Sequence, residues 1–449
     1  MERTLTGKKG IVTPRRVVTG MLLAVAGLSY VQVDIDGVTA SSAVAVASDP
    51  LEERLSQTPP EQRAQVLYDT AEQKLAAGVP KEAASYFARA VTVARDRGDE
   101  SLASHASRRH AVTLVKLAEA EQGKNQDAAK TYYAEAIKTL EQNRSTDEKR
   151  GLIEHVCRDE IALAQALMSR KQDGDESQAL QLLEGVEKRA SENSTLDPQL
   201  LFEASRRLAY LDRRLTGDVK GSLNASLRVL DYYERADDLM GQADTLYRLA
   251  MRAIDLLDYD KAAQYANESV SRWNQAKELE YYGTSKEVKI ATARLLNVWN
   301  LSLKLGQLHD EALMKGQAVA WRQAHQAELQ SLKRLLAQEQ SQLTGLLPKN
   351  ASLEWTLKYG QATLARISGG DASATWEQLL QEKIANNSDE DAFMVQHAWS
   401  MQLLERGQKG SAAQRAQQAL GSYASQLTIW QQVPMLNARL AELRSLSAS

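Results

Sequence analysis

Cysteine, proline and phenylalanine are scarce in this chain of 449 residues. The one cysteine, Cys157, excludes an intramolecular disulfide and any metal site built from several cysteines. It lies in an apolar helical stripe, so we expect a small buried side chain and not a reactive thiol. Only 8 prolines and 3 phenylalanines are present, whereas helix-forming residues such as Ala, Leu, Gln and Glu are abundant. Long helices are therefore expected.

The chain also lacks a strong net charge. Lys and Arg total 55 and Asp and Glu total 58, which gives a net charge of -3. No overall field attracts the chain to nucleic acid or to an anionic membrane, so nucleic-acid binding is not expected. Electrostatic recognition of a partner would have to be local.

Catalytic sequence motifs are missing as well. The sequence contains no Gly-x-x-x-x-Gly-Lys phosphate loop, no Gly-x-Ser-x-Gly turn and no His-Glu-x-x-His helix. The acidic run Asp389, Glu390 and Asp391 lies at a predicted helix start, where carboxylates complement the helix dipole. We interpret it as such, and we predict no catalytic residue and no cofactor.

The six histidines are scattered, and the closest two are five residues apart, which does not align them on one helical face. They are expected to be solvated or hydrogen-bonded, and no metal ligand is predicted. The set comprises His105, His110, His155, His309, His325 and His397.

The first 47 residues differ from the rest. A basic stretch with Arg15 and Arg16 precedes an apolar run, residues 17–33, and a small-residue segment ends in Ala45-Val46-Ala47. This layout is typical of a signal peptide, so residues 1–47 are predicted to direct export to the periplasm or the extracellular space. An uncleaved N-terminal membrane anchor, tethering the chain to the inner membrane by residues 17–33, is the alternative. No other segment is predicted to enter a membrane.

From residue 51 onward, apolar residues recur with helical periodicity, and no sustained alternation predicts a strand. Glycines are placed where one helix would end in a left-handed residue before the next begins. These glycines are Gly78, Gly123, Gly174, Gly217, Gly306 and Gly407.

A small, bulky, small triplet follows these glycines at steps of four and three residues, which puts its members on one helix face. Ala83, Phe87 and Ala90 show it most clearly. Further copies begin at Ala129, Ala179 and Ala412, and weaker ones at Ser222, Ala262, Ala312 and Ala372. Small residues at these positions would let the preceding helix approach closely.

This triplet after a glycine turn resembles the second helix of the tetratricopeptide repeat (TPR), as in Gly78-Val79-Pro80-Lys81-Glu82-Ala83. Successive triplets begin 46, 50, 43, 40, 50, 60 and 40 residues apart, which exceeds the usual period of about 34 residues. The sequence therefore resembles a divergent, long-helix variant of the repeat. The resemblance implies an all-α fold, a right-handed superhelical array of antiparallel helix hairpins, or TPR-like α-solenoid.

The widest spacing contains a long Gln-rich helical stretch that ends at Thr344-Gly345. We place an internal boundary there, with TPR-like repeats over residues 48–343 and C-terminal TPR-like repeats over residues 352–449. One unbroken array is the alternative. The segment from Ile429 to Leu436 is predicted to form the capping helix, and an exposed apolar strip for self-association is the other interpretation.

Two arginines and two tyrosines are candidates for partner binding. In a helix expected from Leu200 to Leu215, Arg207 and Arg214 are seven residues apart, and in the repeat family first helices line the concave groove. There their guanidinium groups would hold an acidic peptide or a C-terminal carboxylate, whereas pairing with Asp212 or Glu203 on a solvated face is the alternative. Tyr132 and Tyr232, from tyrosine doublets, would add contact surface unless they are core residues.

The leading hypothesis is an exported, non-catalytic scaffold that binds a protein or peptide partner in the concave face of the array. A second hypothesis is an all-helical extracytoplasmic enzyme acting on polysaccharide, which would need carboxylates or a Tyr-His-Arg group converging in one cleft. The third is a self-associating structural spacer.

Overall fold

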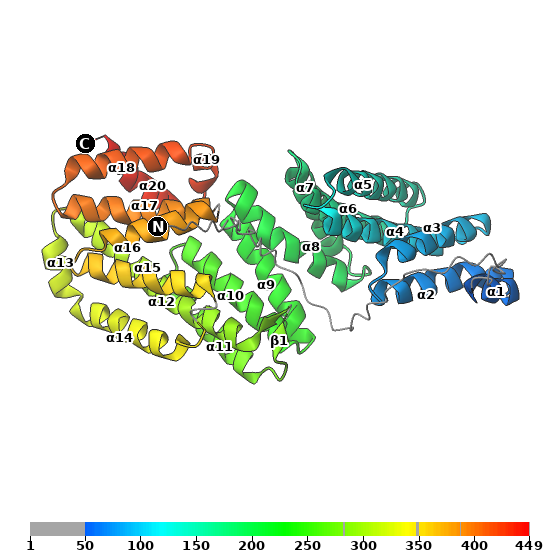
Figure 1. Cartoon of the computed structure of the whole chain (residues 1–449), viewed down its shortest axis with the longest axis horizontal. Coiled ribbons are helices and arrows are strands. Elements are labelled where there is room, and N and C mark those ends of the chain that lie inside the picture. Colours follow the sequence, from blue (N-terminus) through cyan, green and yellow to red (C-terminus); the bar gives the residue numbers. More distant parts are fainter. Residues whose placement is uncertain (1–49, 282, 347–349, 387, 449) are drawn as a thin grey trace, which may run out of the picture.

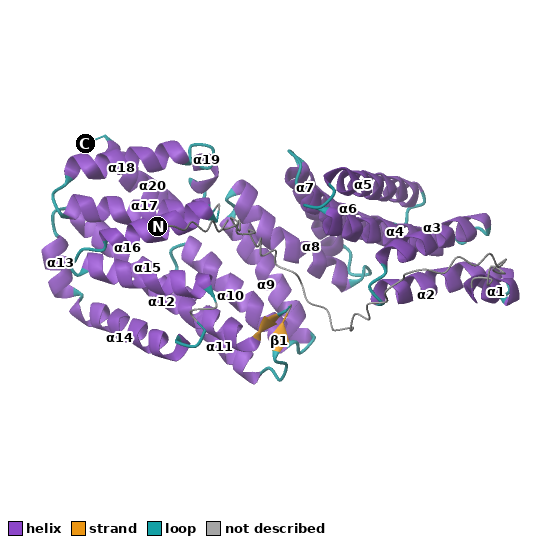
Figure 2. Cartoon of the chain, viewed as in Figure 1, coloured by secondary structure: helices purple, strands orange, loops and turns teal. Residues whose placement is uncertain are grey.

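The computed structural model describes residues 50–281, 283–346, 350–386 and 388–448. In this part of the chain every element is helical except for one hairpin of two-residue strands (Figure 2). Consecutive helices pack against each other as antiparallel pairs along the chain. The predicted all-α array of TPR-like helical hairpins is therefore confirmed.

The N-terminal part begins with a short helix and a 3-10 turn. Three complete hairpins and the first helix of a fourth hairpin follow. The elements of this part are α1 (Pro50–Gln57), the 3-10 turn η1 (Pro60–Gln62), α2 (Arg63–Ala76), α3 (Pro80–Asp96), α4 (Glu100–Glu121), α5 (Gln126–Lys149), α6 (Ile153–Arg170), α7 (Asp175–Glu192) and α8 (Pro198–Leu211).

The remaining elements begin with a π-helical turn. They are η2 (Asp212–Thr216), α9 (Val219–Arg235), α10 (Leu239–Asp255), α11 (Tyr259–Gln275), β1 (Glu280–Tyr281), β2 (Thr284–Ser285), α12 (Lys286–Met314), α13 (Ala318–Ala324), α14 (Gln326–Leu343), α15 (Ala351–Ile367), α16 (Ser373–Ala385), α17 (Asp389–Glu405), α18 (Lys409–Ser422), α19 (Leu427–Trp430) and α20 (Pro434–Ser447).

The predicted triplet lies where two helices of a hairpin meet. Ala83, Phe87 and Ala90 of α3 are all fully buried, and the first is in the same small core cluster as Ala71 of α2. The small side chains bring the helix backbones together while the phenylalanine fills the space beside them. Five of the six predicted glycine stops have positive φ angles between 73° and 88°.

Two predictions from the repeat pattern are wrong, and both fail in α12. Gly306 does not end a helix, because it lies inside this 29-residue helix. A Cβ at Gly306 would lie 3.3 Å from Arg366 Nη2, so the glycine lets α15 approach closely. Ala312 lies in the last turn of α12 and does not open a second helix.

Helix length also explains the wide triplet spacing. Helices α4 and α5 contain 22 and 24 residues. Each hairpin built from such helices needs more chain than the ordinary unit. Cys157 of α6 is fully buried, as predicted.

The helices form two visibly different halves (Figure 1). Helices α1 to α8 follow one another on one side of the molecule, whereas α9 to α20 form a broad layered body on the other. In that body the last helices return to the first, because α20 contacts α10 and α19 contacts η2. Residues from Val219 to Leu446 therefore share one core cluster.

The predicted capping segment is part of this core. Trp430, Val433 and Leu436 are buried beside residues of α17 and α18. The alternative of an exposed apolar strip at this segment is wrong, because these side chains face inward. The division at residue 344 stays a prediction; side chains of α12, α14 and α15 form one core cluster across that position.

Candidate functional site

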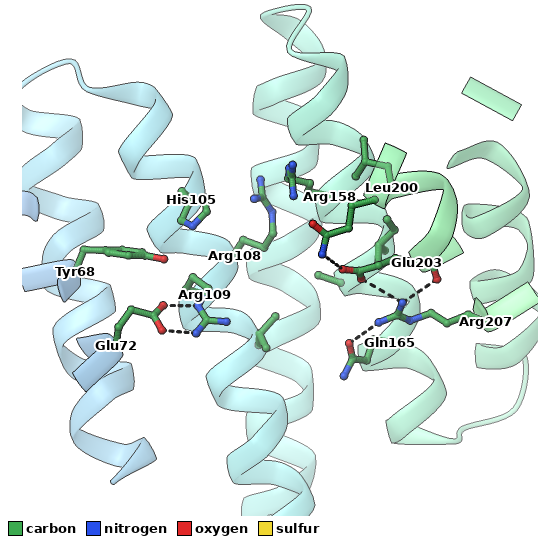
Figure 3. A pocket seen from close by; sticks show the side chains of 14 residues that line it. Tyr68, Glu72, His105, Arg108, Arg109, Arg158, Gln165, Leu200, Glu203 and Arg207 are labelled. Atoms are coloured by element: carbon green, nitrogen blue, oxygen red, sulfur yellow. Dashed lines mark hydrogen bonds and ion pairs between the residues drawn. The ribbon is translucent and has the colours of Figure 1, made fainter. Parts of the chain in front are cut away.

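The first helices of the N-terminal hairpins, α2, α4, α6 and α8, line one groove. A cavity of about 450 Å³ lies in it (Figure 3). Its walls carry Tyr68 and Glu72 from α2, His105, Arg108, Arg109 and Val112 from α4, Arg158, Ile161, Ala162 and Gln165 from α6, and Gln199, Leu200, Glu203 and Arg207 from α8. Four arginines and two glutamates thus face a space with an apolar lining between them.

Arg109 and Glu72 form a bidentate pair at one end of the cavity. Arg109 Nε and Nη2 each donate to a Glu72 oxygen at 2.5 Å. Burial alone would raise the pKa of Glu72, but the bonds from Arg109 hold it below its ordinary value. The pair therefore stays ionised at neutral pH, and the guanidinium is fixed in direction.

Arg108 is held from below by a buried polar network. Its Nε donates to Asp159 Oδ1 at 2.7 Å, and Asn143 Nδ2 donates to both oxygens of the same carboxylate. Ser104 donates to Asp147 at 2.5 Å in the same interior. Burial raises the pKa of Asp159 to about 6 despite the neighbouring guanidinium. These contacts preorganise the arginine at the floor of the groove.

Arg207 lies at the other end of the cavity. Its Nη1 donates to Glu203 Oε2 at 3.3 Å, and its Nη2 donates to Gln165 Oε1 at 3.0 Å. Only 12% of the side chain is exposed. Burial lowers the pKa of this guanidinium, and Glu203 partly opposes that effect. Arg158 pairs with Asp197, the N-cap residue of α8, at 2.7 Å.

Tyr68 and His105 add a phenol hydroxyl and an imidazole to the lining of the cavity. Their rings lie 5.3 Å apart between centroids. Burial, together with Arg108 and Arg109, lowers the pKa of His105, so its imidazole is neutral at neutral pH. Burial and the nearby Glu72 carboxylate raise the pKa of Tyr68 to about 12.

A second cavity of about 390 Å³ continues the groove toward the C-terminal body. Arg207 lines both cavities, so the two adjoin at α8. The second one is lined by Met168, Arg206, Arg207, Ala209, Tyr210, Ser226, Val229, Tyr233, Asp244, Thr245, Arg248, Tyr281 and Lys289. It therefore combines cations with tyrosine rings.

The structure places the four predicted binding residues differently. Arg207 lies in the groove. Arg214 lies over the Tyr210 ring and pairs with Glu176 at 2.7 Å, outside both cavities. Tyr132 and Tyr232 are on the second helices α5 and α9 and line neither cavity. The binding role of these three residues stays a prediction.

The expected continuous α-helix from Leu200 to Leu215 is wrong. The α-helix ends at Leu211, and a π turn follows in which Gly217 N–H donates to the Asp212 carbonyl five residues back. A π turn holds an extra residue, so a spacing of seven no longer keeps Arg207 and Arg214 on one face.

Tyr232, one of the two predicted tyrosines, is stacked on Phe202 of α8 with 4.0 Å between ring centroids.

The sequence reasoning missed most of the groove residues. Tyr68, Glu72, Arg108 and Arg109 lie on first helices, whereas the predicted tyrosines, Tyr132 and Tyr232, lie on second helices. The usable signal was position within the hairpin: polar side chains at helical spacing on a first helix, away from the triplet face. His105 fits that rule together with Arg108 and Arg109, three and four residues later.

Among the described residues, one group has the composition of a metal site. Ligating atoms of Asp310, His397 and Glu442 lie within 4.8 Å of one another. However, the Arg366 guanidinium binds both oxygens of Asp310, and His397 Nε2 lies 2.5 Å from Glu442 Oε2. The buried arginine already neutralises the carboxylate, so we interpret the group as a structural ion network.

His309, next to that group, is fully buried and not solvated. Its Nδ1 lies 3.5 Å from Asp310 Oδ1 and its Nε2 lies 3.5 Å from Glu405 Oε1. His155 and His325 are hydrogen-bonded, to Ser104 Oγ and to the Trp321 carbonyl. Burial lowers the pKa of His309, but the flanking Asp310 and Glu405 carboxylates outweigh it and raise the pKa overall.

No protein family and no curated protein matches this sequence. Among solved structures, a circular tandem repeat protein with a novel repeat topology is 16% identical, covers 89% of this chain and 98% of its own, and has a TM-score of 0.27. The Naa15/Naa10 complex bound to HypK-THB is 12% identical with 89% and 67% covered and a TM-score of 0.20. Yeast Tom70 is 12% identical with 86% and 97% covered and a TM-score of 0.22. These TM-scores are low, and the likeness carries no inference about the function of this chain.

Proposed function

We propose that this chain is a non-catalytic scaffold that binds an acidic segment of a protein partner in the groove of α2, α4, α6 and α8. The observation that carries the proposal is the row of four arginines, each held by an acid or amide, along one groove. A guanidinium has five N–H donors, and the contacts to the protein use only some of them. The others are available to a carboxylate of the ligand.

Local charge supports an acidic ligand. Seven cationic side chains but only three acidic ones line the two adjoining cavities, in a chain whose net charge is -3. The apolar side chains Val112, Ile161 and Leu200 lie between the charges of the first cavity. An acidic peptide with aliphatic residues would match both the positive charge and the apolar lining.

Titration of short fluorescent peptides with the chain tests the proposal. The set contains an acidic peptide with a free C-terminus, its C-terminal amide, and its Glu→Gln version. We expect the Gln version to bind about tenfold more weakly or worse, since charge-assisted hydrogen bonds contribute about 1.5–3 kcal/mol. The amide separates recognition of acidic side chains from recognition of the terminal carboxylate.

Two variants locate the binding site. Arg207→Ala should weaken binding of the acidic peptide, whereas Arg235→Ala should not, because Arg235 pairs with Asp231 on α9 outside both cavities and its side chain is 74% exposed. Equal affinity of the acidic and Gln peptides, or equal effects of the two variants, would refute the proposal.

We propose further that the chain is exported. The support is the sequence layout of residues 1–47. These residues lie outside the part of the chain that the structure describes. Among the described residues no helix is both long and apolar enough to cross a membrane. Fractionation of cells that express a C-terminally tagged chain, followed by N-terminal sequencing of the recovered protein, distinguishes cleavage after Ala47 from an uncleaved anchor at residues 17–33. Recovery in the cytoplasm would contradict export.

A second candidate function has one specific observation in its favour. Tyr68, His105, Arg108 and Arg109 converge in one cleft, which is the requirement stated for an enzyme acting on polysaccharide. A neutral imidazole beside guanidinium groups is suited to remove a proton next to a uronate carboxylate while the arginines stabilise the developing charge.

We prefer the scaffold because the raised pKa of Tyr68 and its carboxylate neighbour Glu72 make this tyrosine a poor proton shuttle. Incubation with a polyuronate decides between the two. Cleavage by β-elimination leaves an unsaturated sugar that absorbs in the ultraviolet, and such a signal, lost in His105→Ala, would favour the enzyme.

A further inference from the structure

Arg213, in the π turn between α8 and α9, binds a residue 177 positions away. Its Nη1 donates to Glu390 Oε2 at 2.7 Å and its Nη2 to Glu390 Oε1 at 2.5 Å. The same guanidinium donates to both oxygens of Asp255 on α10, at 2.9 and 3.1 Å. The Arg213 side chain therefore joins the start of the C-terminal body to α17, one of the last helices of that body.

Arg213 belongs to the π turn and lines neither cavity of the groove. The last residue of this turn is followed by Gly217, whose φ is 73°. A Cβ at this glycine would lie 2.5 Å from Gln432 Cβ and 2.6 Å from the Ile429 carbonyl oxygen. The segment around α19 thus packs directly on the turn, and the two contacts close the body at one place.

The charges at this contact are balanced. Arg252 Nη1 also binds Asp255, at 2.7 Å, so two guanidinium groups face two carboxylates. The Arg213 side chain is 17% exposed and Asp255 is 3% exposed, whereas Glu390 is 32% exposed. Glu390 is therefore the partner that can move into solvent most readily, and Arg213 would keep its pair with Asp255.

We propose that the Arg213–Glu390 pair is a latch that holds the C-terminal helices against the junction of α8 and α9. Opening the latch frees α17 and α19 from η2 and changes the angle between α8 and α10. Those two helices supply Arg206, Tyr210, Asp244 and Arg248 to the second cavity. The latch thereby regulates this end of the groove. The regulatory part rests on the proposed function, whereas the opening itself does not.

Distance measurements by pulsed electron paramagnetic resonance test the latch. Spin labels are attached at Lys220→Cys and Ser425→Cys, two exposed positions on either side of the contact, with Cys157 replaced by Ala. We expect a narrow distance distribution in the otherwise native chain. Glu390→Ala should broaden it and add a longer distance.

Asp389→Ala is the matched control. Asp389 and Glu390 are neighbours in the first turn of α17 and both complement the helix dipole, but only Glu390 binds Arg213. The control should keep the narrow distribution. Identical distributions for Glu390→Ala and the native chain, or equal broadening in both variants, would overturn the latch. Glu390→Gln, which keeps the side-chain shape, replaces Glu390→Ala if circular dichroism shows that the latter is unfolded.

Peptide titration of the same variants tests the regulatory part. Glu390→Ala should bind the acidic peptide about fivefold more weakly, the low end of ordinary coupling between sites. Unchanged affinity despite a broadened distance would overturn regulation and leave the latch and the scaffold standing. If no variant, including the native chain, binds the peptide, the proposed function fails while the distance measurement still decides the latch.

Discussion

Arg108 on α4 and Asp159 on α6 form a hydrogen-bonded ion pair at 2.7 Å, with side chains that are 10% and 0% exposed. The pair joins the first helices of two successive hairpins directly beneath the groove. A buried pair of this kind contributes little net stability by itself, but removal of either partner leaves the other buried without its counter-charge.

Asp159→Ala should therefore lower the free energy of unfolding by about 3–5 kcal/mol, because it leaves the Arg108 guanidinium buried without its carboxylate. Urea unfolding followed by circular dichroism measures the change. Arg235→Ala, which breaks an exposed pair, should cost about 0.5 kcal/mol or less. A similar small loss for Asp159→Ala would show that Arg108 is not held by this carboxylate.

Asp212 should make stability depend on pH. Burial, followed by the nearby Asp218, Glu184 and Glu187 carboxylates, raises its pKa to about 7 from an ordinary value of 3.8. Because the folded-state pKa is raised, the folded chain holds the proton more tightly than the unfolded chain. This contribution is complete below about pH 4 and is lost as pH rises through about 7.

The comparison of Asp212→Asn with the native chain isolates that effect from the titration of other groups. The melting temperature of the variant should rise relative to that of the native chain between pH 5 and pH 8. A constant difference in melting temperature across this range would contradict the raised pKa.

Gly217→Ala should destabilise the chain more than Gly78→Ala. Both glycines have positive φ, 73° and 76°, so both substitutions carry a backbone cost of about 1 kcal/mol. A Cβ at Gly78 meets nothing within 4 Å, whereas a Cβ at Gly217 would overlap Gln432 and the Ile429 carbonyl. Thermal unfolding of the two variants gives the additional cost of that overlap, and equal losses would mean that α19 does not pack on the π turn.

Ala83→Leu should cost about 1–3 kcal/mol, because overfilling a packed helix interface forces side chains and backbone to shift. Ala83 is fully buried in α3. Ser85→Leu, two residues later on the exposed face of the same helix, should change stability by about 0.5 kcal/mol or less. Denaturant unfolding compares the two. Tolerance of leucine at position 83 would contradict the role given to the small member of the triplet.

The hairpin fold was predictable because its causes are local in sequence. Ala83, Phe87 and Ala90 show helical spacing, and Gly78 marks the turn before them. The prediction at Gly306 failed because its cause is not local. The Arg366 side chain, sixty residues later in the sequence, packs against Gly306. A local sequence pattern carries no information on this tertiary contact.

The groove was only partly predictable for a similar reason. Arg207 was identified from a repeat resemblance that assigns first helices to the groove. Arg214 was predicted to share that face, but after the π turn it lies over the Tyr210 ring and pairs with Glu176. No sequence pattern used for ordinary helices signals that extra residue. The acidic run Asp389–Asp391 was correctly placed in the first turn of a helix, yet the contact of Glu390 depends on tertiary structure.

The return of α19 and α20 to η2 and α10 sets an order for folding during synthesis. Each hairpin from α2 to α8 contacts mainly its neighbours in sequence, so it can complete its packing soon after it leaves the ribosome. The body that begins at α9 has to wait for Trp430 and Leu436, which complete its core. During that interval its apolar surfaces are exposed, and a chain that stops before α19 would leave them so permanently.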